Sequence, residues 1–325
     1  MTTLPRLLRV LFAVLPLAAA LPAQADYPDK PLKLVVPYAP GGITDNLARA
    51  LADGIGRELK QPVVVENKVG AGAIVGTGAA ARSPADGYTL LMASNGNLVV
   101  TPLITRKLNY DTERDLKVIA VVGEVPTVLV ANTSLPVTDM KSLGEYGRAN
   151  AGKLNYASLG QGNVLYLTMR KIEDDLKIRM TEVPYKGSVP ALTALMGNDV
   201  QLYVDVLPGA LPFIQAGKLR ALGVPMDQRI EWLPDVPTLR EQGLPAFHAA
   251  SWLGIAVPTG TPPEAIAALQ GAIKRHTQEP EFRRTFTKAG MLLLPPMDGA
   301  QVDAYLKADR ERWGALVRQH NISVD

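Results

Sequence analysis

An α/β fold with two domains is predicted from three features of the sequence. Short apolar runs alternate with helical patterns, which is typical of a parallel sheet with helices on both faces. Most of these runs are continuously apolar rather than alternating, as expected for strands that are buried on both sides. The length of 325 residues favours two domains over one.

The first 25 residues are predicted to be a secretory signal (1–25) that is not part of the fold. Two arginines precede an apolar run over residues 10–21, and residues 23–25 (AQA) fit the small-x-small cleavage pattern. The apolar run is shorter than the roughly 20 residues that span a bilayer. We therefore expect cleavage after Ala25, export and, in a Gram-negative cell, a periplasmic location.

The expected strands follow from the apolar runs in chain order. They cover residues 32–37 (LKLVVP), 62–66, 89–93, 118–122, 127–131, 154–157, 181–184, 200–206, 219–224 and 253–257. Helices are expected between them. In residues 43–59 an apolar residue recurs every four positions and forms one face. Residues 263–276 begin with proline and are rich in alanine, and apolar residues form a further stripe over 302–317.

Two connections between the domains are expected, at residues 122–127 and 243–251. The predicted domain I combines residues 26–125 with 249–325, and domain II covers 126–248. One domain is then inserted into the other, and a ligand cleft is expected between them.

Composition excludes several classes of function. Lys and Arg number 34 against 31 Asp and Glu, which is too balanced for a protein whose affinity for nucleic acid rests on phosphate neutralisation. Cysteine is absent, which excludes disulfides, thiolate metal sites and cysteine nucleophiles. Only 3 histidines are present, so a His-rich metal site is not expected. No metal and no cofactor are expected. A nucleophilic serine elbow is also missing. His248 is the one conceivable base of an exported hydrolase, and we expect it to be packed and the protein not to be an enzyme.

Glycine-rich turns after predicted strands are the candidate binding elements. Residues 37–45 (PYAPGGITD) open the first helix, where Gly41 and Gly42 allow close backbone approach and the helix N-terminus favours an anion. Thr44 or Asp45 could cap that helix. The alternative is a tight turn without a ligand. Residues 69–78 (VGAGAIVGTG) match neither nucleotide-binding fingerprint and predict a small-residue helix packed on the sheet, or else an anion-facing helix start.

Polar turns also follow two later strands. Residues 94–97 (SNGN) end one strand, and residues 158–163 (SLGQGN) repeat the strand, turn and helix pattern in the predicted second domain. Two helix N-termini that face one cleft could hold both ends of a dicarboxylate. Asp205 lies in an apolar strand and needs a hydrogen-bond donor, from a ligand or from backbone. Lys186 is either a surface cation or a cleft residue.

These segments together resemble the tripartite tricarboxylate transporter receptor family, also called the Bug family of periplasmic solute-binding proteins. The likeness covers essentially the whole mature chain. Its motifs include residues 34–45 (LVVPYAPGGITD), 61–72 (QPVVVENKVGAG), 84–91 (PADGYTLL), 156–162 (YASLGQG), 183–192 (VPYKGSVPAL) and 233–245 (LPDVPTLREQGLP).

The resemblance implies a type II periplasmic-binding-protein fold, in which two α/β domains close over a small ligand, usually a carboxylate. It also implies that the two glycine-rich loops clamp the ligand, and that residues 94–97 and Asp205 line the cleft. Expected ligand contacts are therefore Tyr38, Pro40, Gly41, Gly42, Thr44, Asp45, Ser94, Asn95, Asn97, Ser158, Gly160, Gln161, Gly162, Asn163, Tyr166, Lys186 and Asp205. Asn163 and the run 166–168 (YLT) depart from the small residue and His-Leu-Ala that are common in the family; a larger amide beside the loop and a phenol in place of an imidazole could reshape the pocket.

The function expected from the sequence is that of a monomeric receptor for a small organic anion, a carboxylate. By the resemblance, it delivers the anion to a tripartite tricarboxylate-type transporter with a large and a small membrane subunit. An alternative with the same fold is a ligand-sensing receptor for a signalling partner.

Overall fold

The computed structural model describes residues 27–160 and 163–323. The predicted signal segment 1–25 and the predicted contacts Gln161 and Gly162 lie outside the described residues. The strands are β1 (Leu32–Val36), β2 (Val63–Asn67), β3 (Thr89–Ser94), β4 (Leu116–Asn132), β5 (Asn155–Ser158), β6 (Thr181–Pro184), β7 (Leu202–Val206), β8 (Leu219–Gly223), β9 (Ala250–Pro258) and β10 (Leu292–Leu293). The helices are α1 (Ile43–Leu59), α2 (Ile74–Ala81), the π-helix η1 (Gly96–Val100), α3 (Thr101–Ile104), α4 (Thr112–Asp115), α5 (Met140–Ala149), α6 (Val164–Leu176), α7 (Ser188–Met196), α8 (Leu207–Gln215), α9 (Pro263–Gln278), α10 (Pro280–Lys288) and α11 (Gly299–Gln319).

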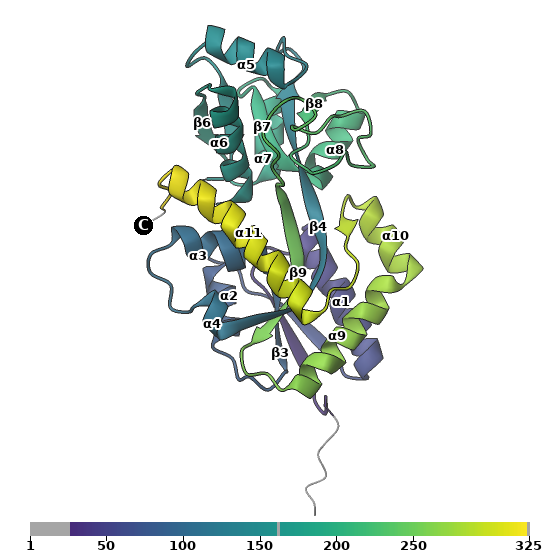
Figure 1. Cartoon of the computed structure of the whole chain (residues 1–325). Coiled ribbons are helices and arrows are strands. Elements are labelled where there is room, and N and C mark those ends of the chain that lie inside the picture. The colour runs from purple at the N-terminus through teal and green to yellow at the C-terminus, as the bar shows by residue number, and fades with distance from the viewer. Residues whose placement is uncertain (1–26, 161–162, 324–325) are drawn as a thin grey trace, which may run out of the picture.

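The predicted α/β class is confirmed. The strands form one sheet in the order β2-β1-β3-β9-β4-β7-β5-β6, with β8 and β10 paired to β4, and helices lie on both of its faces (Figure 1). The edge strand β2 is only half-buried, because one side of it lacks a neighbour, and Val64 on it is 58% exposed.

Strand β4 passes through the whole molecule and joins the two halves of the sheet (Figure 1). The expectation of separate strands at 118–122 and 127–131 is wrong, because residues 123–126 stay extended and pair with β9. The first part of β4 pairs with β9, and its last residues pair with β7 and β8.

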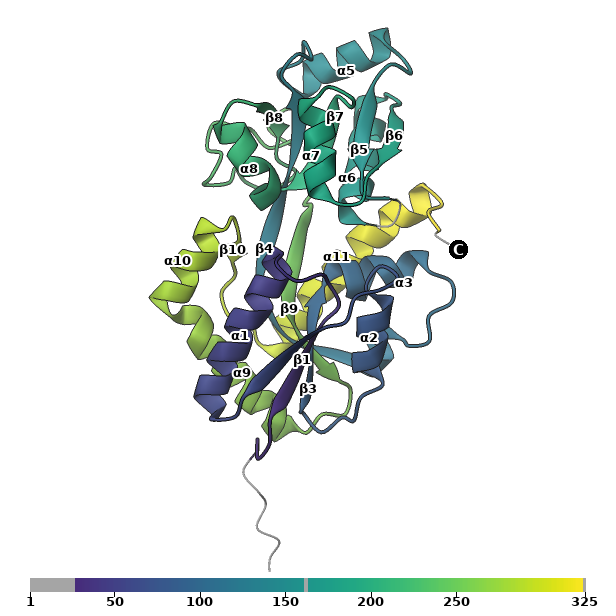
Figure 2. The same ribbon diagram turned by 180° about the vertical axis from the view of Figure 1, so that it is seen from behind.

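The register of these strands brings two carboxyl edges together. Strands β1, β2 and β3 are parallel in the first half of the sheet, and β5, β6 and β7 are parallel in the second. At the carboxyl end of β3, Ser94 lies opposite Leu253 of β9; at the carboxyl end of β7, Val206 lies opposite Thr127 of β4. Both ends therefore adjoin the point where Pro126 of β4 pairs with Ala250 of β9. We call this point, where β4 and β9 pass between the two halves of the sheet, the crossing, and the turns after these strands face it. Figure 2 shows the first turn of α1 directed at the second half.

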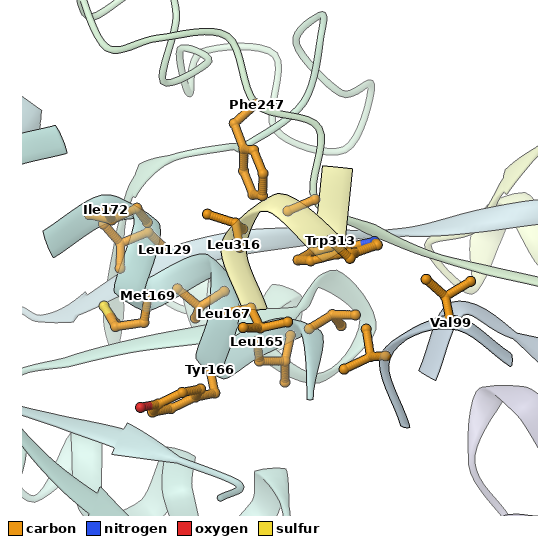
Figure 3. Packing of buried hydrophobic residues seen from close by; sticks show 14 of the residues in the cluster. Val99, Leu129, Leu165, Tyr166, Leu167, Met169, Ile172, Phe247, Trp313 and Leu316 are labelled. Atoms are coloured by element: carbon orange, nitrogen blue, oxygen red, sulfur yellow. The ribbon is translucent and has the colours of Figure 1, made fainter. Parts of the chain in front are cut away.

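Helix α11 bridges the two halves of the sheet. It begins with a capping box made by Asp298 and Gln301, then runs obliquely from the first half to α6 of the second (Figures 1 and 2). Figure 3 shows Leu165 and Leu167 of α6 next to Leu316 of α11, within one continuous apolar cluster. Burial of this apolar surface stabilises the contact between α6 and α11.

The predicted small-residue helix is confirmed as α2. A Cβ added at Gly76 would lie 2.5 Å from the carbonyl oxygen of Lys68 and 2.8 Å from the Cβ of Pro37, so only glycine allows this close packing. The preceding turn runs through positive φ at residues 70–73. In the described residues no helix combines the length and apolarity that a membrane span requires.

A polar network fixes α11 to the strands β4 and β9 where they run side by side between the two halves of the sheet. Glu124 of β4 accepts hydrogen bonds from His248 at 3.0 Å and from the Tyr305 hydroxyl at 2.5 Å. The other ring nitrogen of His248 lies 2.8 Å from Asp227, and Arg312 donates to the His248 carbonyl at 2.7 Å. His248 is thus packed between two carboxylates, where it has a structural role.

Protonated His248 is expected to stabilise the fold. Burial lowers the pKa of His248, but its hydrogen bond to Glu124 and the charge of Glu124 outweigh this and raise the pKa above the ordinary 6.5. A raised folded pKa gives stability that is fully present below about pH 6.5 and lost as the pH rises through the folded value. We expect the stability of the His248→Gln variant not to show this decrease with rising pH. The measurement is the urea unfolding free energy of both proteins from pH 5.5 to 8.5, and a constant difference between them would contradict the expectation.

Candidate ligand-binding site

The turn between β1 and α1 presents an open helix N-terminus. Gly42 is the N-cap, with φ −80°, and no side chain caps the first N–H groups of the helix. Gly41 has φ +89°, and a Cβ added at either glycine would meet no atom within 4 Å. The first N–H groups of a helix have no acceptor within the helix. Backbone donors, a positive dipole end and free space therefore coincide at this turn, which suits an anion.

Asp45 fixes the conformation of this turn through hydrogen bonds. It is 2% exposed and accepts hydrogen bonds from the Gly41 N–H at 3.0 Å, from Arg49 at 2.9 Å and from Asn67 at 2.8 Å. Burial would raise the pKa of Asp45, but these hydrogen bonds outweigh it and lower the pKa. The expectation that Thr44 or Asp45 caps α1 is wrong, since Gly42 is the N-cap and Asp45 reaches back to Gly41.

The polar residues after β3 form a buried framework behind the first turn. The Tyr38 and Ser94 hydroxyls lie 2.6 Å apart, and Asn97 accepts from the Ser94 N–H at 2.8 Å. Asn97 also donates to Thr77 at 3.0 Å, and Asn95 donates to a β9 carbonyl at 2.8 Å. Ser94, Asn95 and Asn97 are at most 4% exposed. The bond between Ser94 and Tyr38 joins them to the turn that carries the exposed Pro40, and their predicted ligand contacts remain predictions.

The turn between β5 and α6 is held by its own side chains. Ser158 accepts from the Gly160 N–H at 2.9 Å, and Asn163 donates to the Gly160 carbonyl at 3.0 Å. Asn163 also caps α6 by accepting from the N–H groups of Leu165 and Tyr166. The first turn of α6 is therefore already partly satisfied, in contrast to that of α1. Space remains open beside Gly160, where an added Cβ would meet no atom within 4 Å.

Two further predicted contacts adjoin the turn between β5 and α6: the Tyr166 N–H donates to Asn163, and Tyr185, the neighbour of Lys186, donates its N–H to the Ser158 carbonyl. Lys186 is exposed beside Gly187. Tyr166 is 8% exposed and belongs to the apolar cluster between α6 and α11, where it points away from α11 in Figure 3.

A second open helix N-terminus is that of α7, which the sequence analysis missed. Gly187 is its N-cap with φ +125° and makes no side-chain cap. Ser188, the first residue of α7, is half-buried and donates to Asp205 at 2.5 Å. The Gly-Ser pair after residues 181–184 is the signal that could have found it, because the isolated Asp205 requires a donor.

Asp205 at the end of β7 is fully buried. Its Oδ1 bonds to Ser188, and among the described residues its Oδ2 has no hydrogen-bond partner. Burial raises the pKa of Asp205 to about 6, although hydrogen bonds from Ser188, the Val206 N–H and Tyr203 act in the opposite direction. The sequence left open a ligand or a backbone donor; the structure provides the backbone donor, Val206, together with a side-chain donor, Ser188, that was not expected, and contact with a ligand remains a prediction.

The site therefore offers backbone donors and hydroxyls from both halves of the sheet. The described part of the chain contains no cluster of histidine and acidic residues that could hold a metal ion. Such an arrangement suits the binding of an anion between the two halves.

The chain is similar to known proteins over most of its length. Residues 47–322 match the model of the tripartite tricarboxylate transporter family receptor. Protein BugT of Bordetella pertussis is 34% identical over 98% of both chains. A periplasmic transporter structure has a TM-score of 0.81 and 34% identity, covering 92% of this chain and all of its own.

Two similar structures contain named ligands. An R. palustris protein with adipate has a TM-score of 0.81 and 30% identity, covering 92% of this chain and 99% of its own. MatC from Rhodopseudomonas palustris with bound malate has a TM-score of 0.78 and 31% identity, covering 90% of this chain and all of its own. The fold of two α/β domains that is typical of periplasmic binding proteins is thereby confirmed.

Proposed function

Because the chain belongs to the tripartite tricarboxylate transporter receptor family, whose members are periplasmic solute-binding receptors, we propose that it captures a small dicarboxylate. The receptor acts after export, with cleavage after Ala25. It delivers its ligand to a membrane transporter with one large and one small membrane subunit. The main support for this proposal is a pair of helix N-termini without side-chain caps, those of α1 and α7. They lie at the carboxyl edges of the two halves of the sheet, and both edges face the crossing.

Each uncapped N-terminus is proposed to bind one carboxylate. The N–H groups of α1 beside Gly42 take one end, and Ser188 with the first N–H groups of α7 takes the other. Hydrogen bonds between N–H groups and a charged acceptor are roughly twice as strong as neutral ones. The relatives with adipate and malate support a ligand with two acid groups.

Closure is proposed to accompany binding. Residues 26–125 with 249–325 form one domain, residues 126–248 the other, and both rotate about the crossing of β4 and β9. A ligand that contacts both domains binds the closed state more tightly than the open one and so shifts the equilibrium towards it. Binding and release complete the cycle, and no covalent bond changes.

A thermal-shift screen tests this function. Malate and adipate are expected to raise the melting temperature of the purified mature chain, because a ligand that binds only the folded state at 100 times its Kd adds about 2.7 kcal/mol to stability. Glycerol, an uncharged polyol, serves as the control and is expected to cause no shift at the same concentration. Absence of a shift with every di- and tricarboxylate tested, or a shift of equal size with glycerol, would contradict the proposal.

A further inference from the structure

Three side-chain oxygens lie together where β7 meets the start of α7. The Ser188 Oγ is 2.5 Å from the Asp205 Oδ1 and 3.2 Å from the Tyr203 hydroxyl. Asp205 and Tyr203 are both 0% exposed, whereas Ser188 is half-buried at the open N-terminus of α7. Asp205 therefore reaches that N-terminus only through Ser188, and it is too deeply buried to touch a ligand in this conformation.

Among the described residues, no basic side chain acts on this carboxylate from the elements packed around it; the uncapped N-terminus of α8, which begins two residues after Asp205, is the positive dipole end beside it. On its own strand the neighbour is the Tyr203 hydroxyl, whose pKa is raised by burial and by Asp205, so it stays protonated. Helix α7 contributes Ser188, and β4 contributes Val128 in register. Towards α8, Oδ2 lies 2.6 Å from the position that a Cβ of Gly209 would take. In the described residues no basic side chain is among the groups that shift the pKa of Asp205.

Counting hydrogens on these oxygens gives two states of the site. When Asp205 is ionised, it accepts the only hydrogen of Ser188, and the serine presents lone pairs outward. When Asp205 carries a proton, it donates to Ser188, whose own hydrogen becomes free to point at the mouth of the site. A ligand carboxylate needs a donor, and it is repelled by a second buried negative charge. Both effects favour the protonated state when the anion is bound.

We propose that Asp205 is a positioning residue that acts through Ser188, and that a dicarboxylate binds together with one solvent proton taken up by the Asp205 carboxylate. The inference rests on the proposed function and adds a regulation of the same site. Uptake requires little reorganisation, because the pKa of Asp205 in the free protein is already raised to about 6. Bound anion raises that pKa further, so affinity falls as the pH rises above about 6.

Isothermal titration of malate and adipate in buffers of different ionisation enthalpy measures the proton directly. At pH 7.5 we expect uptake that approaches one proton per ligand. The affinity is expected to fall by up to tenfold per pH unit above about pH 6, by linkage, and to be flat below it. Binding with no proton uptake would overturn this inference alone. Failure of every dicarboxylate to bind would overturn the proposed function, and the inference with it.

Variants separate positioning from a merely structural role. Asp205→Asn mimics the neutral state, since its amide donates to Ser188, and we expect no proton uptake, a flat pH profile and tighter binding than the native protein at pH 8. Ser188→Ala is expected to bind at least tenfold more weakly, with a smaller pH dependence that reflects charge repulsion alone. The exposed Asp199, just beyond α7, supplies the matched control, and Asp199→Asn is expected to keep the native profile. Weaker binding by Asp205→Asn at pH 8, above all of an ammonium-bearing acid such as aspartate, would instead assign Asp205 to a cationic ligand group and overturn the inference.

Discussion

Replacing Gly42 by valine is expected to weaken malate or adipate binding roughly 100-fold, equivalent to about 2.8 kcal/mol. The valine side chain would stand in the free space beside the first N–H groups of α1, so an anion could no longer approach them. Each hydrogen bond to a charged group contributes about 1.5 to 3 kcal/mol, and more than one would be lost. Calorimetry of the variant against the native protein measures the loss.

The fold itself should tolerate this change. Gly42 has an extended conformation with φ −80° that any residue adopts, and valine at an N-cap costs about 1 kcal/mol. Gly41 is a poorer test because its φ of +89° would strain any other residue. The matched control is Gly299→Val at the start of α11, where an added Cβ also meets no atom within 4 Å. Equal ligand affinities of the Gly42→Val and Gly299→Val variants would show that the N-terminus of α1 does not contact the ligand.

Most of the fold could be predicted because its strands are apolar runs bounded by glycine or proline. The boundaries of β3, β6 and β8 differ from the expected ones by at most a residue. The continuity of β4 could not be predicted, because Gly123, Glu124 and Pro126 locally favour a turn. Partners far away in sequence keep them extended: Trp252 pairs with Glu124, and His248 and Tyr305 bind its carboxylate. Local propensity yields to tertiary contact at this position.

The candidate site was predictable to the level of turns but not of atoms. The glycine pattern identified the turn at Gly42, yet it did not reveal that Asn163 already caps α6 or that α7 is uncapped. Those differences depend on side-chain hydrogen bonds that one residue forms with another two or three positions away, and several alternatives fit the same sequence. The role of Ser188 could not be predicted, because its partner Asp205 is 17 residues away in sequence.

Asp309→Ala is expected to cause the largest loss of stability, about 3 to 5 kcal/mol, because it breaks a buried charged network. Asp309 is 2% exposed and accepts the indole N–H groups of Trp252 at 2.8 Å and Trp313 at 2.9 Å, while Arg312 lies 3.3 Å away. Alanine would leave both buried N–H groups without an acceptor and would open a cavity beside them. The measurement is the free energy of unfolding in urea.

The comparison with two other variants tests the reason for that loss. Asp309→Asn keeps one acceptor oxygen but turns an amide N–H₂ towards the other indole, so an intermediate loss is expected. Asp303 lies on the same helix but is exposed, and Asp303→Ala is expected to change stability by less than about 0.5 kcal/mol. Because Trp252 pairs with Glu124 at the crossing, loss of the Asp309 bonds also loosens α11 from the strands about which the domains are proposed to rotate. An Asp309→Ala protein as stable as Asp303→Ala would show that the indoles find other acceptors and that α11 does not fix the crossing.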